Sequence, residues 1–109
     1  MTPREIDALV AQKVVGCKNV QILPRCGPVW VYSNGDYTPV PDYSTTGNGM
    51  LLVIGAMRGK NYAMNIDCFT GEVWVSHLQE KGSGYSGVKP LPRAVSLAAL
   101  KALGVEVGA

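Results

Sequence analysis

The first segment of the chain has the pattern of an amphipathic helix. Its apolar residues recur at helical spacing, at Ile6, Leu9, Val10 and Val14. Thr2 can cap the helix, Pro3 suits its first turn and Glu5 completes a capping box. Gly16 supplies the left-handed residue that commonly ends a helix. The pattern therefore predicts a helix between Thr2 and Gly16.

Between residues 20 and 40 the pattern changes to short apolar runs that are broken by prolines. The best strand runs from Val29 to Tyr32. Asn34 and Gly35 are typical of a tight β-hairpin turn, so we expect residues 36–40 to pair back on this strand. Pro39 should restrict that pairing to the edge of a sheet.

A second helical pattern follows, with apolar residues at i, i+3, i+4 and i+7: Met50, Val53, Ile54 and Met57. Ser44 or Thr45 can cap this helix, and Gly59 can end it. Three glycines interrupt it, at Gly47, Gly49 and Gly55. Each costs about 1 kcal/mol relative to alanine in a helix, so the helix depends on packing. Such glycines also let another backbone or a ligand approach closely.

The second half of the chain predicts a β-hairpin and a last helix. Alternating residues mark the first strand, at Tyr62, Met64, Ile66 and Cys68, and Val73 and Val75 mark the second. Thr70 to Glu72 form the turn. The last helix should start near Pro92 and stop at Gly104, with apolar residues in more than one stripe: Val95, Leu97, Leu100 and Leu103. Such a helix is either well buried or meets a partner chain, so we expect a homo-oligomer.

This order of elements predicts an α+β fold. A small antiparallel sheet packs with about three helices, in an α/β/α sandwich. The 109 residues leave room for one domain, 1–109, with one modest core. With 47% hydrophobic and 17% charged residues, the composition is that of a globular protein.

Three stretches of the sequence resemble a known family. They are TPREIDALVAQKVVG at the start, VPDYST before the second helix and SLAALKALGVEV at the end. Together with the element order they resemble the phage ABA sandwich domain, a family of small phage-encoded proteins. Such proteins often have tryptophan where this chain has Cys17, and an acidic second helix without glycines. The resemblance implies the fold and a phage origin, and it implies no catalytic residues.

The charge pattern narrows the class of partner. The net charge is only +2, and ten Lys and Arg residues are scattered among eight acidic residues. We therefore do not expect duplex nucleic acid as a binding partner. Small anionic ligands remain possible. No segment reaches the roughly 20 apolar residues that a membrane helix needs, and the start of the chain lacks the pattern of a signal peptide. The cysteine count of three is odd, which favours reduced thiols and a cytoplasmic protein. With the phage origin that the resemblance implies, this would be the cytoplasm of the host cell during infection.

The segment Gly82–Gly87 has the spacing G-x-G-x-x-G of a dinucleotide-binding loop. It lacks a βαβ unit, and two prolines separate it from the last helix, so a Rossmann site is not expected. We predict instead a flexible loop over residues 80–90 that meets an anion. Its ligand-binding residues would be Lys81, Ser83, Tyr85, Lys89 and Arg93. Tyr43 is a further candidate for stacking on a base. The alternative is a solvated linker.

Catalytic and metal chemistry have weaker support. A Cys3His zinc set would be Cys17, Cys26, Cys68 and His77. Their spacing is much longer than in the usual zinc knuckle, and the alternation places Cys68 on an apolar face. His77 could act as a base for Cys68, but no orienting acid is evident. We therefore predict no catalytic residue, metal or cofactor.

The favoured function at this point is binding without catalysis. The protein would sequester a small anionic, nucleotide-like ligand, such as a host immune signal that a phage must neutralise. The alternative is an inhibitor or adaptor that acts through a protein surface, with a host protein as partner. A small enzyme is the third class.

Overall fold

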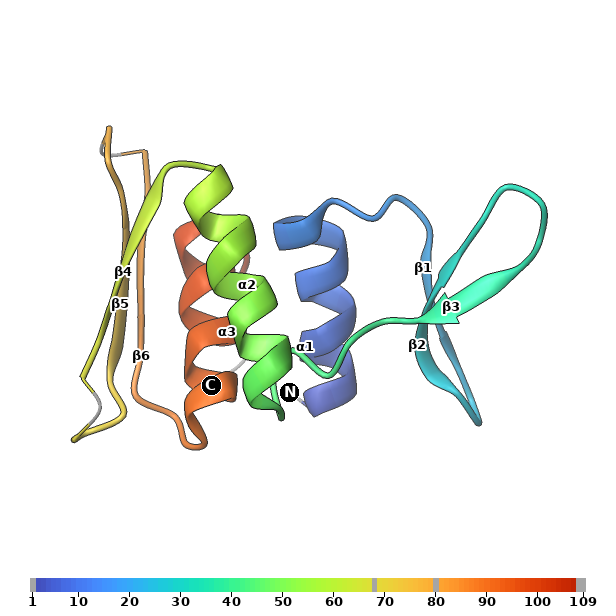
Figure 1. The fold of residues 1–109 in the computed structure, drawn as a ribbon, viewed down its shortest axis with the longest axis horizontal. Coiled ribbons are helices and arrows are strands. Elements are labelled where there is room, and N and C mark those ends of the chain that lie inside the picture. Colours follow the sequence, from blue (N-terminus) through green and yellow to red (C-terminus); the bar gives the residue numbers. More distant parts are fainter. Residues whose placement is uncertain (1, 68, 80, 108–109) are drawn as a thin grey trace.

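The helices of this protein lie between two small sheets (Figure 1). The computed structural model describes residues 2–67, 69–79 and 81–107. In chain order its elements are α1 (Pro3–Leu9), η1 (Val10–Val15), β1 (Val20–Leu23), β2 (Gly27–Val31), β3 (Tyr37–Pro39), α2 (Gly47–Gly59), β4 (Tyr62–Ile66), β5 (Val73–His77), β6 (Ser83–Ser86) and α3 (Leu91–Ala102).

Each sheet of the described residues has three antiparallel strands, in the orders β1-β2-β3 and β4-β5-β6. Helices α2 and α3 pack on one face of the second sheet, and α1 lies between them and the first sheet (Figure 1). The predicted α+β class, with small antiparallel sheet structure packed on helices, is confirmed. Two sheets are present where the sequence suggested one, and they lie on opposite sides of the helices.

The first helix has the predicted start and end. The Glu5 backbone N–H donates to the Thr2 hydroxyl at 3.2 Å, so Thr2 is the cap. After Leu9 the helix continues as the π-helical segment η1, and Gly16 ends it with a φ of 93°. Ile6, Val10 and Val14 are buried in the core. Local sequence signals were sufficient here because the cap and stop residues act within one turn.

The predicted hairpin is present in the first sheet as β2 and β3, and β1 adds a third strand. β2 pairs with β3 through Trp30 and Thr38, and Gly35 takes a φ of 92° in the turn between them. β3 contains Pro39 and lies at the edge of the sheet, as expected of a strand that lacks one N–H donor.

The predicted cap of the second helix was wrong by one residue. Thr46 caps α2, and its hydroxyl accepts the Gly49 N–H at 3.0 Å. Ser44 is buried instead, and its N–H donates to the Asp7 carboxylate at 2.9 Å. Gly49 is the site of the close approach that we predicted, because a Cβ there would collide with the Asp42 carbonyl. The PDYST segment is thus a joint that ties α1 to α2.

The predicted β-hairpin is present in β4 and β5. Met64 lies opposite Val75, and Gly71 turns the chain with a φ of 77°. Along β5 the side chains alternate between buried and exposed, with Val73 and Val75 in the core. Cys68 lies outside the described residues.

The prediction of a flexible loop over residues 80–90 was wrong. Ser83–Ser86 form strand β6, which pairs antiparallel with β5, and α3 packs directly against it. A Cβ on Gly84 would come within 2.6 Å of the Ala102 nitrogen and closer still to the Ala98 carbonyl oxygen. One on Gly82 would collide with the Ala102 carbonyl. The glycine spacing that resembles a nucleotide loop therefore lets a strand lie against a helix backbone.

The last helix lies in the centre of the molecule. Leu97 and Leu100 are 5% and 0% exposed, and Leu103 is half-buried. Gly104 ends the helix region with a φ of 80°, and its N–H donates to the Lys101 carbonyl. The second apolar stripe of α3 is thus covered within the chain by α2 and the β4–β6 sheet. Homo-oligomerisation therefore needs another surface. None of the described helices has the length and apolar character of a membrane span.

Candidate functional site at the β6 edge

The outer face of the β4–β6 sheet carries an exposed aromatic pair. The pairing of strands places Asn65, Trp74 and Tyr85 in one row across the sheet. The Trp74 and Tyr85 ring centroids are 5.5 Å apart with the planes tilted by 42°. Their side chains are 43% and 46% exposed. Two large rings that support each other and face solvent form a surface on which a flat ligand could stack.

A hollow of about 290 Å³ lies beside this pair, between β6 and the end of α3. Lys81, Ser83 and Lys101 are among its lining residues, together with Tyr62. The Lys101 ammonium group donates to the Tyr85 carbonyl oxygen at 3.1 Å, so it is held over the β6 edge. A lysine at such an edge also discourages pairing with other strands. Two cations and a hydroxyl are therefore within one small hollow.

An adjoining hollow of about 230 Å³ contains His77. It shares Gly82 and Ser83 with the first hollow. The Gln79 N–H donates to His77 Nδ1 at 3.0 Å, so Nε2 carries the proton in the neutral imidazole. The Tyr62 ring meets the imidazole edge-on at 4.7 Å. Among the described residues no carboxylate bonds to His77, so the ring is arranged as a hydrogen-bond donor rather than as an oriented base.

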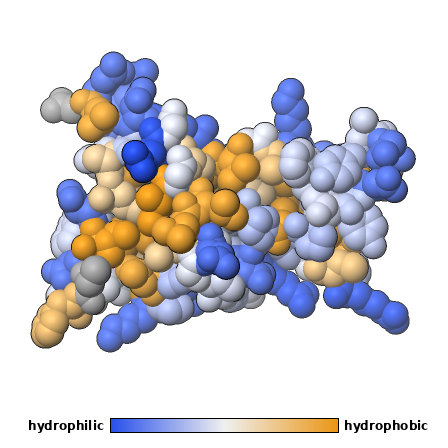
Figure 2. Space-filling view, viewed as in Figure 1, coloured by the Kyte–Doolittle hydropathy of each residue, from blue (hydrophilic) through white to orange (hydrophobic). Residues whose placement is uncertain are grey.

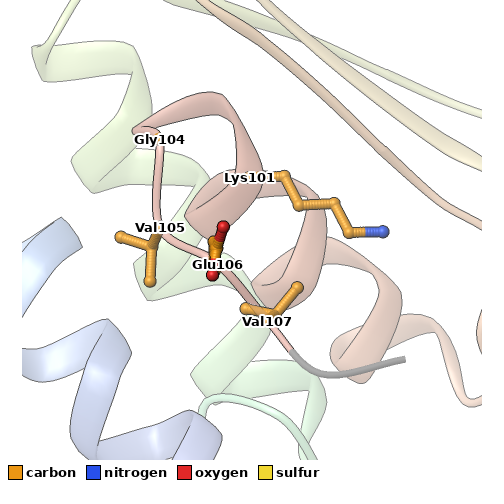
Figure 3. Close-up of a pocket in the computed structure, with 5 residues that line it drawn as sticks. All are labelled: Lys101, Gly104, Val105, Glu106 and Val107. Atoms are coloured by element: carbon orange, nitrogen blue, oxygen red, sulfur yellow. The ribbon is translucent and has the colours of Figure 1, made fainter.

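A larger hollow of about 560 Å³ lies on the other side of Lys101 (Figure 3). It is a shallow groove in which Gly104–Val107 runs back beside α3, and Lys101 reaches out from the helix away from Val105. Glu106 lines this groove and adds a negative charge. An anion is therefore better accommodated in the smaller hollow, which has two lysines and no acid among its lining residues.

The structure separates the six predicted ligand residues into three places. Lys81 and Ser83 line the hollow at the β6 edge, and Tyr85 lies on the adjoining face of the sheet. Lys89 and Arg93 are at the junction of β6 and α3, where Lys89 is exposed and Arg93 is half-buried. The third place holds the remaining residue, Tyr43.

Tyr43 is 3% exposed and lines a different pocket with Cys17 and Trp30. The structure therefore does not bring it to the hollow of Lys81. Its position in a turn suggested a surface residue, but the joint between α1 and α2 encloses it.

The sequence reasoning missed Lys101 and Trp74 as neighbours of the predicted residues. Lys101 is 16 residues from Tyr85 and reaches it only because α3 folds back on β6. One signal was available, since Lys101 is the only charged residue between Val95 and Gly104 of a largely buried helix. Trp74 faces solvent beside Tyr85, because the alternation along β5 places it on the face opposite Val73 and Val75.

The cysteines do not come together in the described part of the chain. Cys17 is half-buried, and burial raises the pKa of its thiol, whereas Cys26 is exposed. Cys68 lies outside the described residues. The Cys68–His77 pair and the complete Cys3His set both include Cys68, so they lie outside the described residues as well. Over residues 2–67, 69–79 and 81–107 no three His, Cys, Asp or Glu side chains are grouped so that they could hold a metal ion.

The whole fold matches a solved structure, the 2.0 Å crystal structure of a phage protein from Bacillus cereus ATCC 14579. The TM-score is 0.72 over 99% of this chain and 93% of that protein. This chain has the fold of a phage protein. The sequence identity is 17%, so the likeness concerns the fold alone. No protein-family model and no curated protein matches the chain. The resemblance to the phage ABA sandwich family is not confirmed.

Proposed function

We propose that this chain is a binding protein without catalytic activity, which takes a small anionic, nucleotide-like ligand at the β6 edge. One observation carries the proposal: Lys81 and Lys101 line a hollow with Ser83, next to the exposed Trp74–Tyr85 pair. Ser83 and Tyr85 are two residues apart on one strand, so their side chains share a face at a spacing of about 7 Å. A phosphate and a ring of one ligand could therefore be bound together.

The phosphate would lie between the two lysines. Each ammonium group has three donors, of which Lys101 already uses one for the Tyr85 carbonyl. The Ser83 hydroxyl and the His77 Nε2–H add neutral donors. Hydrogen bonds from a cation to an anion are about twice as strong as neutral ones. Lys81 and Lys101 are both exposed, so salt should screen the attraction and weaken binding.

The base would stack on Trp74 and Tyr85. Stacking of a base on an aromatic side chain contributes about 1–3 kcal/mol and tolerates different bases. Asn65 lies beside Trp74 in the same row and offers an amide to a ring edge. These features favour the binding of nucleotides as a class rather than of a nucleotide with one specific base.

The arrangement of His77 favours binding over turnover. Its Nδ1 already accepts a backbone hydrogen bond, so the imidazole is set as a donor toward an anion. A protein that sequesters a ligand needs enclosure, cations and flat surfaces, and it needs no general base. The phage fold of the comparison supports a role in infection, and we place the protein in the host cytoplasm, where it would remove a nucleotide-like immune signal.

A thermal-shift panel of cyclic and linear nucleotides tests the proposal. A ligand at 100 times its dissociation constant should add about 2.7 kcal/mol to the free energy of unfolding. For any nucleotide that binds, Lys101→Ala should weaken binding at least about tenfold, the equivalent of one lost charged hydrogen bond. Lys18→Ala is the matched control, because Lys18 is exposed between η1 and β1. If no nucleotide binds, or if Lys18→Ala weakens binding equally, the proposal is wrong.

One observation favours the second class, an inhibitor or adaptor that uses a protein surface. Leu51 and Leu52 of α2 are 61% and 52% exposed. Figure 2 shows an apolar area across the middle of this face, over α2. Exposed apolar patches commonly mark interaction sites. This face is now also the best candidate for the expected homo-oligomer.

Light scattering on the parent and on Leu51→Lys separates the two uses of the α2 face. Self-association predicts a parent oligomer that Leu51→Lys dissociates. A parent that stays monomeric at high concentration rules self-association out. A pull-down from host lysate, repeated with Leu51→Lys, then tests for a host partner.

A further inference from the structure

The pocket lined by Tyr43 lies at the other end of the molecule, between the end of η1 and the first sheet. Its volume is about 270 Å³. Trp30 and Val15 lie at its mouth, 39% and 44% exposed, while Tyr43 and Val40 form its floor, 3% and 8% exposed. None of the residues that line it is charged. The hollow at the β6 edge shares no residue with it, so the two sites are independent.

The floor of this pocket contains a hydrogen-bond donor, the Tyr43 hydroxyl. Within the described part of the chain no hydrogen bond reaches the Tyr43 hydroxyl, although the residue is almost fully buried. Burial, and then the nearby Cys17 and Asp7, raise the pKa of Tyr43 to about 12, so the hydroxyl remains a donor at neutral pH. The hydroxyl oxygen is not among the fully buried polar atoms of the described residues, so it reaches the open space of the pocket. There it can donate to an acceptor that a ligand supplies.

The wall formed by Cys17 is fixed by the unusual end of the first helix. The backbone N–H groups of Gly16 and Cys17 both donate to the Ala11 carbonyl, at 3.0 and 2.8 Å. The π-helical segment η1 that they close is a rare conformation, and such segments occur frequently at functional sites. On the opposite wall the Trp30 ring is supported by Tyr32, with the centroids 5.2 Å apart. The pocket is therefore preformed between two firm walls.

We propose that this pocket binds a small, neutral, flat aromatic molecule with one hydrogen-bond acceptor, which the Tyr43 hydroxyl recognises. The size follows from the volume, since a cavity of about 150 Å³ holds benzene and this pocket has room for two fused rings. The neutral charge follows from the uncharged lining, because an ion would lose its hydration without gaining a partner. The aromatic character follows from the exposed Trp30 face and the two prolines that line the pocket, Pro39 and Pro41.

Three related compounds test each part of the proposal: 1-indanone, indane and 1-indanecarboxylate. The first has a carbonyl acceptor, the second has none and the third is an anion. Alkylation of Cys17, followed by mass spectrometry, reports occupancy, and the exposed Cys26 is the internal control. Quenching of Trp30 fluorescence in a Trp74→Phe background gives a second readout. We expect saturable protection of Cys17 alone, with 1-indanone binding at least about tenfold more tightly than the carboxylate.

The variant Tyr43→Phe tests the hydroxyl. It should weaken the binding of 1-indanone about threefold to tenfold, which corresponds to one neutral hydrogen bond. The affinity for indane should not change. The melting temperature should not fall, because the lost hydroxyl has no hydrogen bond within the described residues. The proposal is overturned if 1-indanone protects neither cysteine or protects both equally. It is also overturned if the carboxylate binds as well, or if Tyr43→Phe leaves the affinity for 1-indanone unchanged.

Discussion

The substitution Gly84→Ala distinguishes a ligand-binding glycine loop from a packed strand. A glycine of a mobile loop can become alanine at little cost to stability, and it often gains from a stiffer unfolded chain. Gly84 instead lies in β6 against the backbone of α3. We therefore expect Gly84→Ala to destabilise the folded protein even when no ligand is present.

The expected size follows from the contacts of the added methyl group. Its carbon would lie 2.6 Å from the Ala102 nitrogen and 3.0 Å from Lys101 Cβ, and closer still to the Ala98 carbonyl oxygen. Normal contacts of this kind begin near 3.4 Å, so β6 and α3 must separate by more than an ångström to relieve the contact with the Ala98 carbonyl. The nearest atoms belong to backbone and cannot rotate away. Overpacking of this kind costs about 2–3 kcal/mol, which lowers the melting temperature by roughly 10–20 °C.

Urea denaturation and a thermal melt of the ligand-free protein measure the effect. Gly55→Ala is the matched control, because its added methyl group meets nothing within 4 Å and lies in the middle of α2. It should raise stability by about 1 kcal/mol through helix propensity. If Gly84→Ala melts at the parent temperature, β6 does not pack against α3 as described, and the explanation of the glycine spacing fails.

Three further changes test the core, the joint and the site. Leu100→Ala should lower the free energy of unfolding, measured by urea denaturation, by about 2–5 kcal/mol because Leu100 is fully buried. Leu51→Ala, on the exposed face of α2, should change it by less than about 0.5 kcal/mol. Equal effects of the two variants would contradict the assigned core. Burial raises the pKa of Asp7 despite its hydrogen bonds with Ser44. The protonated carboxyl group therefore contributes to the stability of the folded protein at low pH. This contribution is lost as the pH rises through the raised pKa. The free energy of unfolding of Asp7→Asn should therefore increase relative to that of the parent as the pH rises from 4 to 7. A difference between the two proteins that stays constant with pH would contradict this. Lys89→Ala should leave the melting temperature unchanged and weaken nucleotide binding less than Lys101→Ala does. The reason is that Lys89 is exposed and does not line the hollow. A larger loss of affinity in Lys89→Ala than in Lys101→Ala would indicate that the anion binds at the β6–α3 junction.

The sequence alone determined the elements whose signals act over one or two turns. Thr2 and Gly16 bound the first helix, and Asn34 with Gly35 turns the first hairpin, because caps and tight turns depend on the φ angles and hydrogen bonds of adjacent residues. The alternation around Val75 placed β5 correctly, since the period of two is a local property of a strand. From these elements the α+β class followed directly.

Only the tertiary structure decided what the glycines, the lysines and Tyr43 do. Gly84 permits contact with the α3 backbone at Ala98 and Ala102, more than ten residues further along the chain. The residues adjacent to Gly84 do not indicate which backbone it meets. Lys101 joins Ser83 in one hollow for the same reason. Tyr43 is flanked by turn residues, yet the joint between α1 and α2 buries it. Each of these depends on two distant segments packing together, and packing is set by the shape of both partners rather than by the pattern of either.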